Sequence, residues 1–397
     1  MREDMFVELA VNEVSGARSA PARRVARILT SRAMLALALI TLAVSCRAVE
    51  AGGDAPRPDD AAYAPPAGIR LLPDLTLSGY ATIEGLVPDA RSRAQPSLLG
   101  TANDDDSQVG HHPRLDLSHL SGIAWWEPSP AWKVLGEIDL QDIVQVPAHS
   151  SEDGKSSEPY IALDRLYVDY RASDAVSLRA GKFLTPIGRW NQEHSDPQVW
   201  TVLRPLISQS AFPTSATGVM IFGSAPIAAQ WFDYQVYASD GGEWRPSPRS
   251  HPFDSAVGAR VSTELDPSFQ LGVSVSHFRQ DGVGASSFDL VGGDARLNLF
   301  GSEFSGEVIQ RRGRDANVGE EHGWFVQAAV PVASRWWVVG RLEDYRRSVD
   351  ESESRTSLLG LVYRSGRHWV FKAEWAQATG STNGLPSGFL SSITMAY

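Results

Sequence analysis

The chain has 397 residues, of which 43% are hydrophobic, and its 36 basic and 47 acidic residues give a net charge of -11 at pH 7. This composition is too polar for a bundle of membrane-spanning helices, and the acidic balance argues against nucleic acid as a partner. Cys46 is the only cysteine, which excludes an intramolecular disulfide framework.

A single apolar segment lies near the start of the chain. Residues 33–46 form an apolar run of 14 residues behind Arg23, Arg24, Arg27 and Arg32, which is typical of an export signal and short for a membrane span. Residues 1–51 are therefore interpreted as a signal peptide with a long N-terminal extension. Residues 52–74 are rich in Pro, Ala and Asp, which predicts a periplasmic linker without fixed structure.

From residue 75 to residue 397 the chain alternates apolar and polar residues in segments of about ten, which is typical of β-strands. We predict sixteen of them. They are 75–86, 114–126, 131–145, 160–171, 175–184, 216–223, 229–238, 255–265, 269–280, 287–299, 302–312, 322–331, 335–346, 354–364, 368–378 and 389–397.

The connections between these segments alternate in length. Those after even-numbered strands are short turns, whereas those after odd-numbered strands are mostly longer and polar, including 87–113, 146–159, 185–215 and 239–254. Short periplasmic turns and long external loops are typical of barrels in bacterial outer membranes. The predicted fold class is an all-β, up-and-down antiparallel transmembrane β-barrel. A soluble secreted all-β protein and an outer-membrane barrel hydrolase remain as alternatives.

Alternation within the strands predicts which side chains face lipid. Trp336 and Val338 share one face of their strand, and Phe371 lies on the corresponding face of another. A charged side chain facing hydrocarbon costs about 2 to 4 kcal/mol at the bilayer midplane, so the charges are expected in the lumen. His119 is an exception, because it shares a parity with apolar residues of its strand. The predicted lumen wall comprises Arg165, Asp169, Arg171, Arg179, Arg341, Glu343, Lys372 and Glu374.

Aromatic residues cluster at the short turns, where a periplasmic girdle is expected. The last predicted strand ends on Tyr397, and such an aromatic end is similar to the assembly signal of outer-membrane barrels. The residues of the expected girdle are Trp125, Trp126, Trp132, Trp231, Phe269, Phe300, Trp336, Trp337 and Trp369.

The third long connection carries a distinctive order of residues. Leu184-Thr185-Pro186-Ile187-Gly188 is followed by Asn191, His194, Asp196-Pro197, Arg204-Pro205-Leu206-Ile207 and Phe212-Pro213. This order resembles porin-like proteins grouped with the phosphate-selective porin O/P superfamily. The resemblance implies a loop folded into the lumen, a homotrimer in outer-membrane lipid, and passive diffusion of small hydrophilic solutes or ions without enzymatic chemistry.

The charged residues of this loop are the expected pore constriction, because rings of charge set the potential that a passing ion meets. They are Arg189, Glu193, His194, Asp196 and Arg204. Alternatively, these charges pair with one another and attach the loop to the wall. A ladder of lysines is absent, since only Lys133, Lys155, Lys182 and Lys372 occur, which disfavours dedicated anion capture.

No motif predicts a cofactor or a metal. The acidic run Asn103–Ser107 has hard oxygen ligands that could bind a divalent cation, but such a run is interpreted as a solvated acidic loop. The pair His111-His112 is interpreted as an exposed loop pair, because no third ligand is evident nearby. The G-x-S-x-G motif of serine hydrolases does not occur in the sequence.

Overall fold

The computed structural model describes residues 68–89, 113–147, 159–173, 175–227, 230–244, 252–280, 287–314, 319–348, 352–380 and 387–397. The predicted signal peptide, most of the linker, and the Asn103–Ser107 and His111-His112 segments lie outside these ranges. Within them, none of the helices has the length and apolar character needed to cross a membrane.

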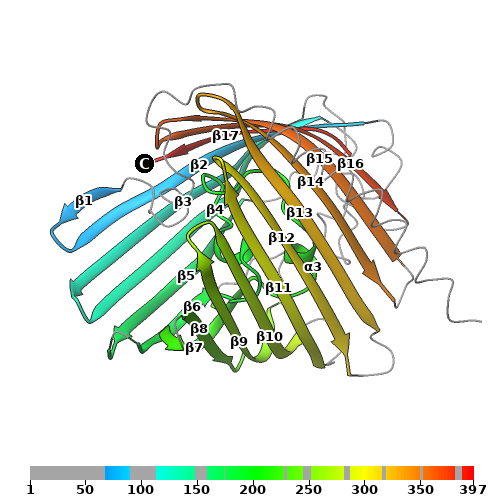
Figure 1. Cartoon of the computed structure of the whole chain (residues 1–397). Helices are drawn as coiled ribbons and strands as arrows, with labels where there is room; N and C mark the ends of the chain where they lie inside the picture. Colours follow the sequence, from blue (N-terminus) through cyan, green and yellow to red (C-terminus); the bar gives the residue numbers. More distant parts are fainter. Residues whose placement is uncertain are drawn as a thin grey trace, which may run out of the picture. The chain divides into compact units, whose positions relative to one another are not determined.

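Sixteen antiparallel strands form a closed barrel, and β17 pairs with β2 to complete it (Figure 1). Each strand pairs with its neighbours in chain order, as expected of an up-and-down barrel. The strands are β2 (Leu75–Pro88), β3 (Arg114–Ser129), β4 (Trp132–Pro147), β5 (Tyr160–Arg171), β6 (Ser177–Leu184), β7 (Ser215–Ile227), β8 (Gln230–Ser239), β9 (Phe253–Asp266), β10 (Phe269–Gln280), β11 (Ser287–Leu299), β12 (Ser302–Gly313), β13 (Glu320–Ala333), β14 (Trp336–Arg347), β15 (Ser352–Ser365), β16 (Trp369–Gly380) and β17 (Gly388–Ala396).

All sixteen predicted strands are confirmed, and one further strand was not predicted. β1 (Ile69–Leu72) pairs with β2 through Ile69 opposite Leu77. The expectation that residues 52–74 lack fixed structure is therefore wrong for residues 69–72. Backbone pairing holds this short segment, and the Asp74 carboxylate after it accepts a hydrogen bond of 2.8 Å from the Trp126 indole.

The outer surface of the barrel is apolar. Side chains such as Val219 and Leu359 are 57% and 62% exposed on this surface, whereas the inward-facing Arg341 and Glu374 are 2% and 3% exposed. A soluble protein does not leave so many large apolar side chains uncovered. The soluble alternative is therefore rejected, and the predicted lipid and lumen faces are confirmed at β14 and β16.

Two β-bulges change the alternation of side chains on the wall. The pairing register shifts between Leu117 and His119 on β3, so that His119 faces inward although Leu117 does not. A second shift lies between Leu163 and Arg165 on β5, and Asp164 is the extra residue there. The bulge on β3 explains why a strict period of two placed His119 with apolar residues.

The expected aromatic girdle is only partly present. Trp126, Trp132 and Trp369 are exposed on the barrel, as a girdle requires. Trp337 is buried and packs inside the barrel against Trp200, with ring centroids 5.7 Å apart. Its assignment to the girdle is therefore wrong, because its strand parity points it into the lumen.

Tyr397 lies across the closing seam of the barrel. Its backbone pairs with Gly79 of β2, and its hydroxyl donates a hydrogen bond of 3.0 Å to the carbonyl oxygen of Ser121 on β3. A Cβ atom at position 79 would lie 2.5 Å from the Tyr397 hydroxyl oxygen. Glycine at this position therefore allows the last side chain to pass over β2.

One lysine faces outward from the wall. Lys182 lies opposite Leu166, which is exposed on the lipid side, yet Lys182 itself is buried. The chain after β8 turns at Gly241 and Gly242, with φ of 83° and 67°, and places the Glu243 carboxylate 2.5 Å from the Lys182 ammonium. Pairing with Glu243 removes the cost of an uncompensated charge on this face.

Candidate functional site

The loop from Thr185 to Thr214 lies inside the barrel. It contains a single turn of 3-10 helix, η2 (Trp190–Gln192), and the short helix α3 (Leu206–Ser210). The buried Thr185 hydroxyl donates a hydrogen bond of 2.7 Å to the Pro213 carbonyl, which joins the two ends of the loop. The predicted folding of the third external loop into the lumen is confirmed.

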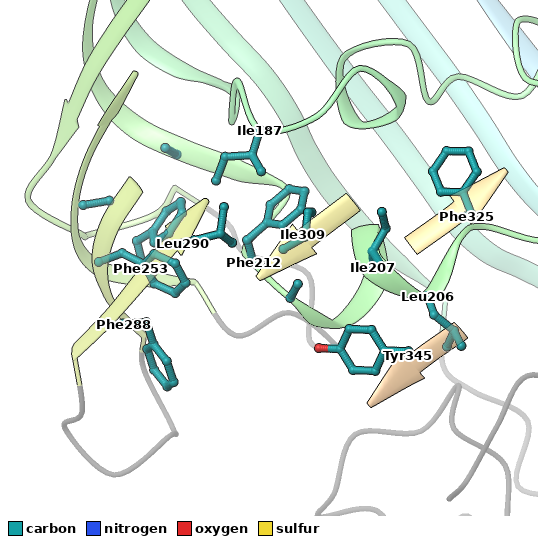
Figure 2. Packing of buried hydrophobic residues seen from close by; sticks show 14 of the residues in the cluster. Ile187, Leu206, Ile207, Phe212, Phe253, Phe288, Leu290, Ile309, Phe325 and Tyr345 are labelled. Atoms are coloured by element: carbon teal, nitrogen blue, oxygen red, sulfur yellow. The ribbon is translucent and has the colours of Figure 1, made fainter. Parts of the chain in front are cut away.

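An apolar face of the loop packs against the wall of strands β9 to β14. Ile187, Leu206, Ile207 and Phe212 are all buried. Figure 2 shows these side chains among apolar residues of the wall. The wall residues are Phe253 of β9, Phe288 and Leu290 of β11, Ile309 of β12, Phe325 of β13 and Tyr345 of β14.

Three buried glutamates of the wall accept hydrogen bonds from the backbone of the loop, and the first is Glu307 of β12. It accepts from the N–H groups of Arg189 and Trp190, at 2.8 and 2.5 Å. Gly188, with φ of 65°, permits this approach, because a Cβ atom there would collide with the Glu307 carboxylate. Hydrogen bonds to ionised acceptors are about twice as strong as neutral ones.

The other two glutamates hold the second half of the loop. Glu374 of β16 accepts from Val202 N at 3.0 Å and from Leu203 N at 2.8 Å. Glu343 of β14 accepts from Leu206 N at 3.0 Å. The start of α3 and the segment before it are thus fixed to the same side of the barrel, because β14 and β16 are close neighbours in the sheet.

Basic residues of this wall donate to oxygens of the loop. The Lys372 ammonium donates to the Asp196 carbonyl at 2.8 Å. Arg364 donates to the carbonyls of Pro197 and Gln198, at 2.8 and 3.1 Å. Arg341 donates to the Thr201 hydroxyl at 2.9 Å. The wall therefore satisfies polar groups that the irregular loop would otherwise leave unpaired.

These contacts change the interpretation of four residues predicted to line an open lumen. Arg341, Glu343, Lys372 and Glu374 do face inward, but each is at most 4% exposed and contacts the loop. They attach the loop to the wall, which is the alternative that the sequence left open.

The charged residues on the loop differ in their partners. Arg189 and Glu193 form an ion pair of 2.8 Å within the loop. Arg204 stacks over the Trp190 ring at 4.7 Å and donates to the Asn191 side chain at 3.2 Å. Asp196 has one buried carboxylate oxygen without a hydrogen-bond partner among the described residues.

His194 contributes no positive charge at neutral pH. Burial, together with the positive charges of Arg204 and Arg165, lowers the pKa of its imidazole to about 3. Burial also lowers the pKa of Arg204 to about 10, which leaves its guanidinium charged. The expectation that His194 is one of the charges of the constriction is therefore wrong, because the sequence did not show how deeply the loop is packed.

The wall of strands β2 to β6 faces the polar side of the loop. Arg165 pairs with Glu137 at 2.5 Å, and Arg179 pairs with Asp169 at 2.7 Å. Arg171 is exposed at the end of β5, next to the short turn. The predicted wall residues Arg165, Asp169 and Arg179 thus point inward, and each has an ionic partner.

Several residues at this site were not singled out from the sequence. Glu303, Glu307 and Arg364 contact the loop from β12 and β15, and their inward parity is the signal that could have identified them. Asp164 could not be assigned in this way, because it lies at the bulge of β5. Among the described residues, no group of three His, Cys, Asp or Glu side chains could hold a metal ion.

Comparison with solved structures shows the fold of outer-membrane porins. An anion-selective porin from Comamonas acidovorans aligns with a TM-score of 0.55 and 14% identity, over 81% of this chain and 99% of that one. OmpF of Salmonella typhi, in complex with daunomycin, aligns with a TM-score of 0.54 and 9% identity, over 81% and 97% of the two chains. The outer membrane channel DcaP of Acinetobacter baumannii aligns with a TM-score of 0.53 and 10% identity, over 82% and 97%.

Sequence comparison is less informative. No family model matches the chain. An uncharacterised protein of Aquifex aeolicus (strain VF5) is 29% identical over 158 residues, which are 38% of this chain and 34% of that protein. The chain therefore matches about a third of that relative's length. The fold and the apolar outer surface place this chain in the bacterial outer membrane, with the architecture of a porin.

Proposed function

We propose that the protein is a porin through which small hydrophilic solutes or ions diffuse passively, with the loop Thr185–Thr214 as its constriction. The observation that carries this proposal is the fixed position of the loop inside the lumen. Three glutamates, three basic residues and an apolar cluster hold it there. Because the loop is fixed to one side of the lumen, we infer a narrowed, polar passage between it and the opposite wall.

Membership of the phosphate-selective porin O/P superfamily and a homotrimeric state are parts of this proposal. They rest on the resemblance of the loop sequence between Leu184 and Pro213. We also propose an export signal in residues 1–51 and a linker after it, and these two assignments rest on amino-acid composition. An outer-membrane hydrolase is the weaker alternative, because two solved structures with this fold, from Comamonas acidovorans and Acinetobacter baumannii, are by description a porin and a channel.

Planar lipid bilayers test the proposal directly. The purified protein, folded in detergent, should insert and produce stepwise conductance increments. Replacing residues 192–199 by a short Gly-Ser connection should raise the size of each increment, because the apolar anchors Ile187, Leu206, Ile207 and Phe212 remain in place. Heat-dependent gel mobility serves as the control for correct folding. A folded barrel that conducts no current would reject the porin, and an unchanged conductance after shortening would reject the constriction.

Size-exclusion chromatography with light scattering tests the oligomeric state. A homotrimer should elute with three times the protein mass of one chain after correction for detergent. A monomer of full conductance would remove the trimer from the proposal without affecting the channel.

A further inference from the structure

The polar side of the loop and the wall opposite it form one group of interacting charges, which we call the pore-facing cluster. Arg204 interacts electrostatically with Asp164 and Asp196, and Asp196 interacts with His119 and Glu84. Charges of the loop and charges of the wall therefore contribute to the electrostatic potential in the same part of the lumen. The cluster consists of Glu84 on β2, His119 on β3, Glu137 and Asp139 on β4, Asp164 and Arg165 on β5, and Asp196 and Arg204 on the loop.

The cluster contains two ion pairs, and within each pair the opposite charges cancel. Arg165 lies 2.5 Å from the Glu137 carboxylate. His119 Nδ1 lies 2.6 Å from Asp139, where a protonated imidazole is favoured by the adjacent carboxylate. These contacts leave four charged groups of the cluster without an ionic partner inside it.

Of the four remaining groups, three are acidic and one is basic. Glu84, Asp164 and Asp196 are carboxylates, and within the described part of the chain no lysine or arginine nitrogen lies within 4.0 Å of any of them. Arg204 is the single cation, and its guanidinium contacts Trp190 and Asn191 rather than a carboxylate. Three carboxyl groups face one cation, so the unbalanced part of the cluster carries a net negative charge.

The wall behind the loop does not compensate for this excess, because its own charges balance. Its six carboxylates face six cations, several of them in direct pairs. The carboxylates are Asp294, Glu303, Glu307, Glu321, Glu343 and Glu374, and the cations are Arg260, Arg296, Arg311, Arg341, Arg364 and Lys372.

The remaining charges nearby change the net charge around the cluster little. Arg189 and Glu193 of the loop cancel, as do Asp169 and Arg179 on the wall. Lys133 lies close to the short turn between β3 and β4, with its ammonium 3.3 Å from the centroid of the Trp125 ring. It adds one positive charge near the periplasmic end, away from the loop.

We propose that the channel prefers cations, and that Asp164 and Asp196 are the residues that set this preference against Arg204. The inference rests on the proposed porin function and names the charge class of its solutes. A negative potential in a narrow passage with low-dielectric walls concentrates cations and depletes anions. One unit charge about 10 Å from a permeating ion in water changes the local concentration of that ion by roughly twofold, so each carboxylate contributes a modest factor.

Reversal potentials across a gradient of potassium chloride in planar bilayers test this inference. The wild-type channel should have a permeability ratio of potassium to chloride above one. Asp164→Asn and Asp196→Asn should each lower that ratio by roughly fourfold, because the local potassium concentration falls and the local chloride concentration rises by similar factors, and Arg204→Gln should raise the ratio by a similar amount. Asp196 lies on the loop, so its variant remains informative if Asp164→Asn does not fold.

The matched control is Asp289→Asn, which removes the same charge from an exposed site on β11, where Asp289 pairs with Arg314 at 2.9 Å. This variant should keep the wild-type ratio. A conducting wild-type channel with a ratio at or below one would overturn the cation preference and leave the porin intact. If Asp289→Asn shifted the permeability ratio as much as Asp196→Asn does, the assignment of the cation preference to the pore-facing cluster would be overturned. A folded barrel without conductance would instead reject the porin function itself.

Discussion

Replacing Glu374 by glutamine should loosen the inserted loop Thr185–Thr214 at one defined place. The two carboxylate oxygens accept hydrogen bonds from Leu203 N at 2.8 Å and Val202 N at 3.0 Å. Glutamine keeps one oxygen but turns an amide NH2 towards the other N–H group, so one hydrogen bond is lost and the charge that strengthened the second is removed.

The magnitude depends on the kind of bond that is lost. A hydrogen bond to a charged group contributes about 1.5 to 3 kcal/mol, and Glu374 is 3% exposed, so water does not replace it easily. We expect local opening of the segment around Val202 and Leu203 to become easier by about 2 to 3 kcal/mol. Amide hydrogen exchange there should accelerate by roughly 30- to 150-fold, and open-channel current noise should increase.

Hydrogen–deuterium exchange with mass spectrometry, on the folded protein in detergent, measures this effect. Peptides around Arg189 and Trp190, which Glu307 holds, serve as an internal reference and should exchange as in the wild type. Glu264→Gln is the matched control, because Glu264 is exposed near a short turn and does not contact the loop. Unchanged exchange at Val202 and Leu203 would refute the reasoning that wall carboxylates hold the loop.

Three further predictions concern the seam, the outer rim and the pH dependence. Gly79→Ala should impair folding, as measured by heat-dependent gel mobility, whereas Gly122→Ala should be tolerated because a Cβ atom there meets no atom within 4 Å. Glu243→Gln should destabilise the barrel by about 3 to 5 kcal/mol in urea unfolding by leaving Lys182 buried without its partner, and adding Lys182→Met should recover most of this loss. Because the pKa of His194 is lowered to about 3, the unfolded chain binds a proton that the folded barrel does not, so stability is full above about pH 6.5 and declines towards pH 3. His194→Gln should flatten that decline, and an unchanged pH profile would contradict it.

The barrel could be predicted almost entirely because its pattern is local. A lipid face and a wet face impose a period of two on each strand, and one-sided insertion imposes alternating loop lengths. Both signals can be read from neighbouring residues, which is why all sixteen strands were found. β1 escaped prediction, because its pairing with β2 depends on a tertiary contact and its surroundings are rich in proline.

The β-bulges mark the limit of that pattern. One extra residue at Asp164, and the register shift beside His119, reverse the parity of the strand residues on the far side of each bulge. A bulge has no reliable signature in a single sequence, so the inward position of these two residues required the pairing of whole strands.

The candidate site was predicted in outline and corrected in detail. The sequence placed the loop at the correct connection and identified Arg189, Glu193, Asp196 and Arg204 as its charges. It did not show that His194 is neutral, since the pKa depends on burial and on Arg165 of a different strand.

The sequence alone determined the strand order, the apolar outer surface and the position of the inserted loop, because each of these depends on whether a residue faces lipid or water. The partners of the buried charges were decided only by the tertiary structure. Glu343 and Glu374 lie on the wall, but the N–H groups they accept from are more than a hundred residues away along the chain. Only the closed barrel brings them together, and that proximity turns predicted pore-lining residues into the supports of the loop.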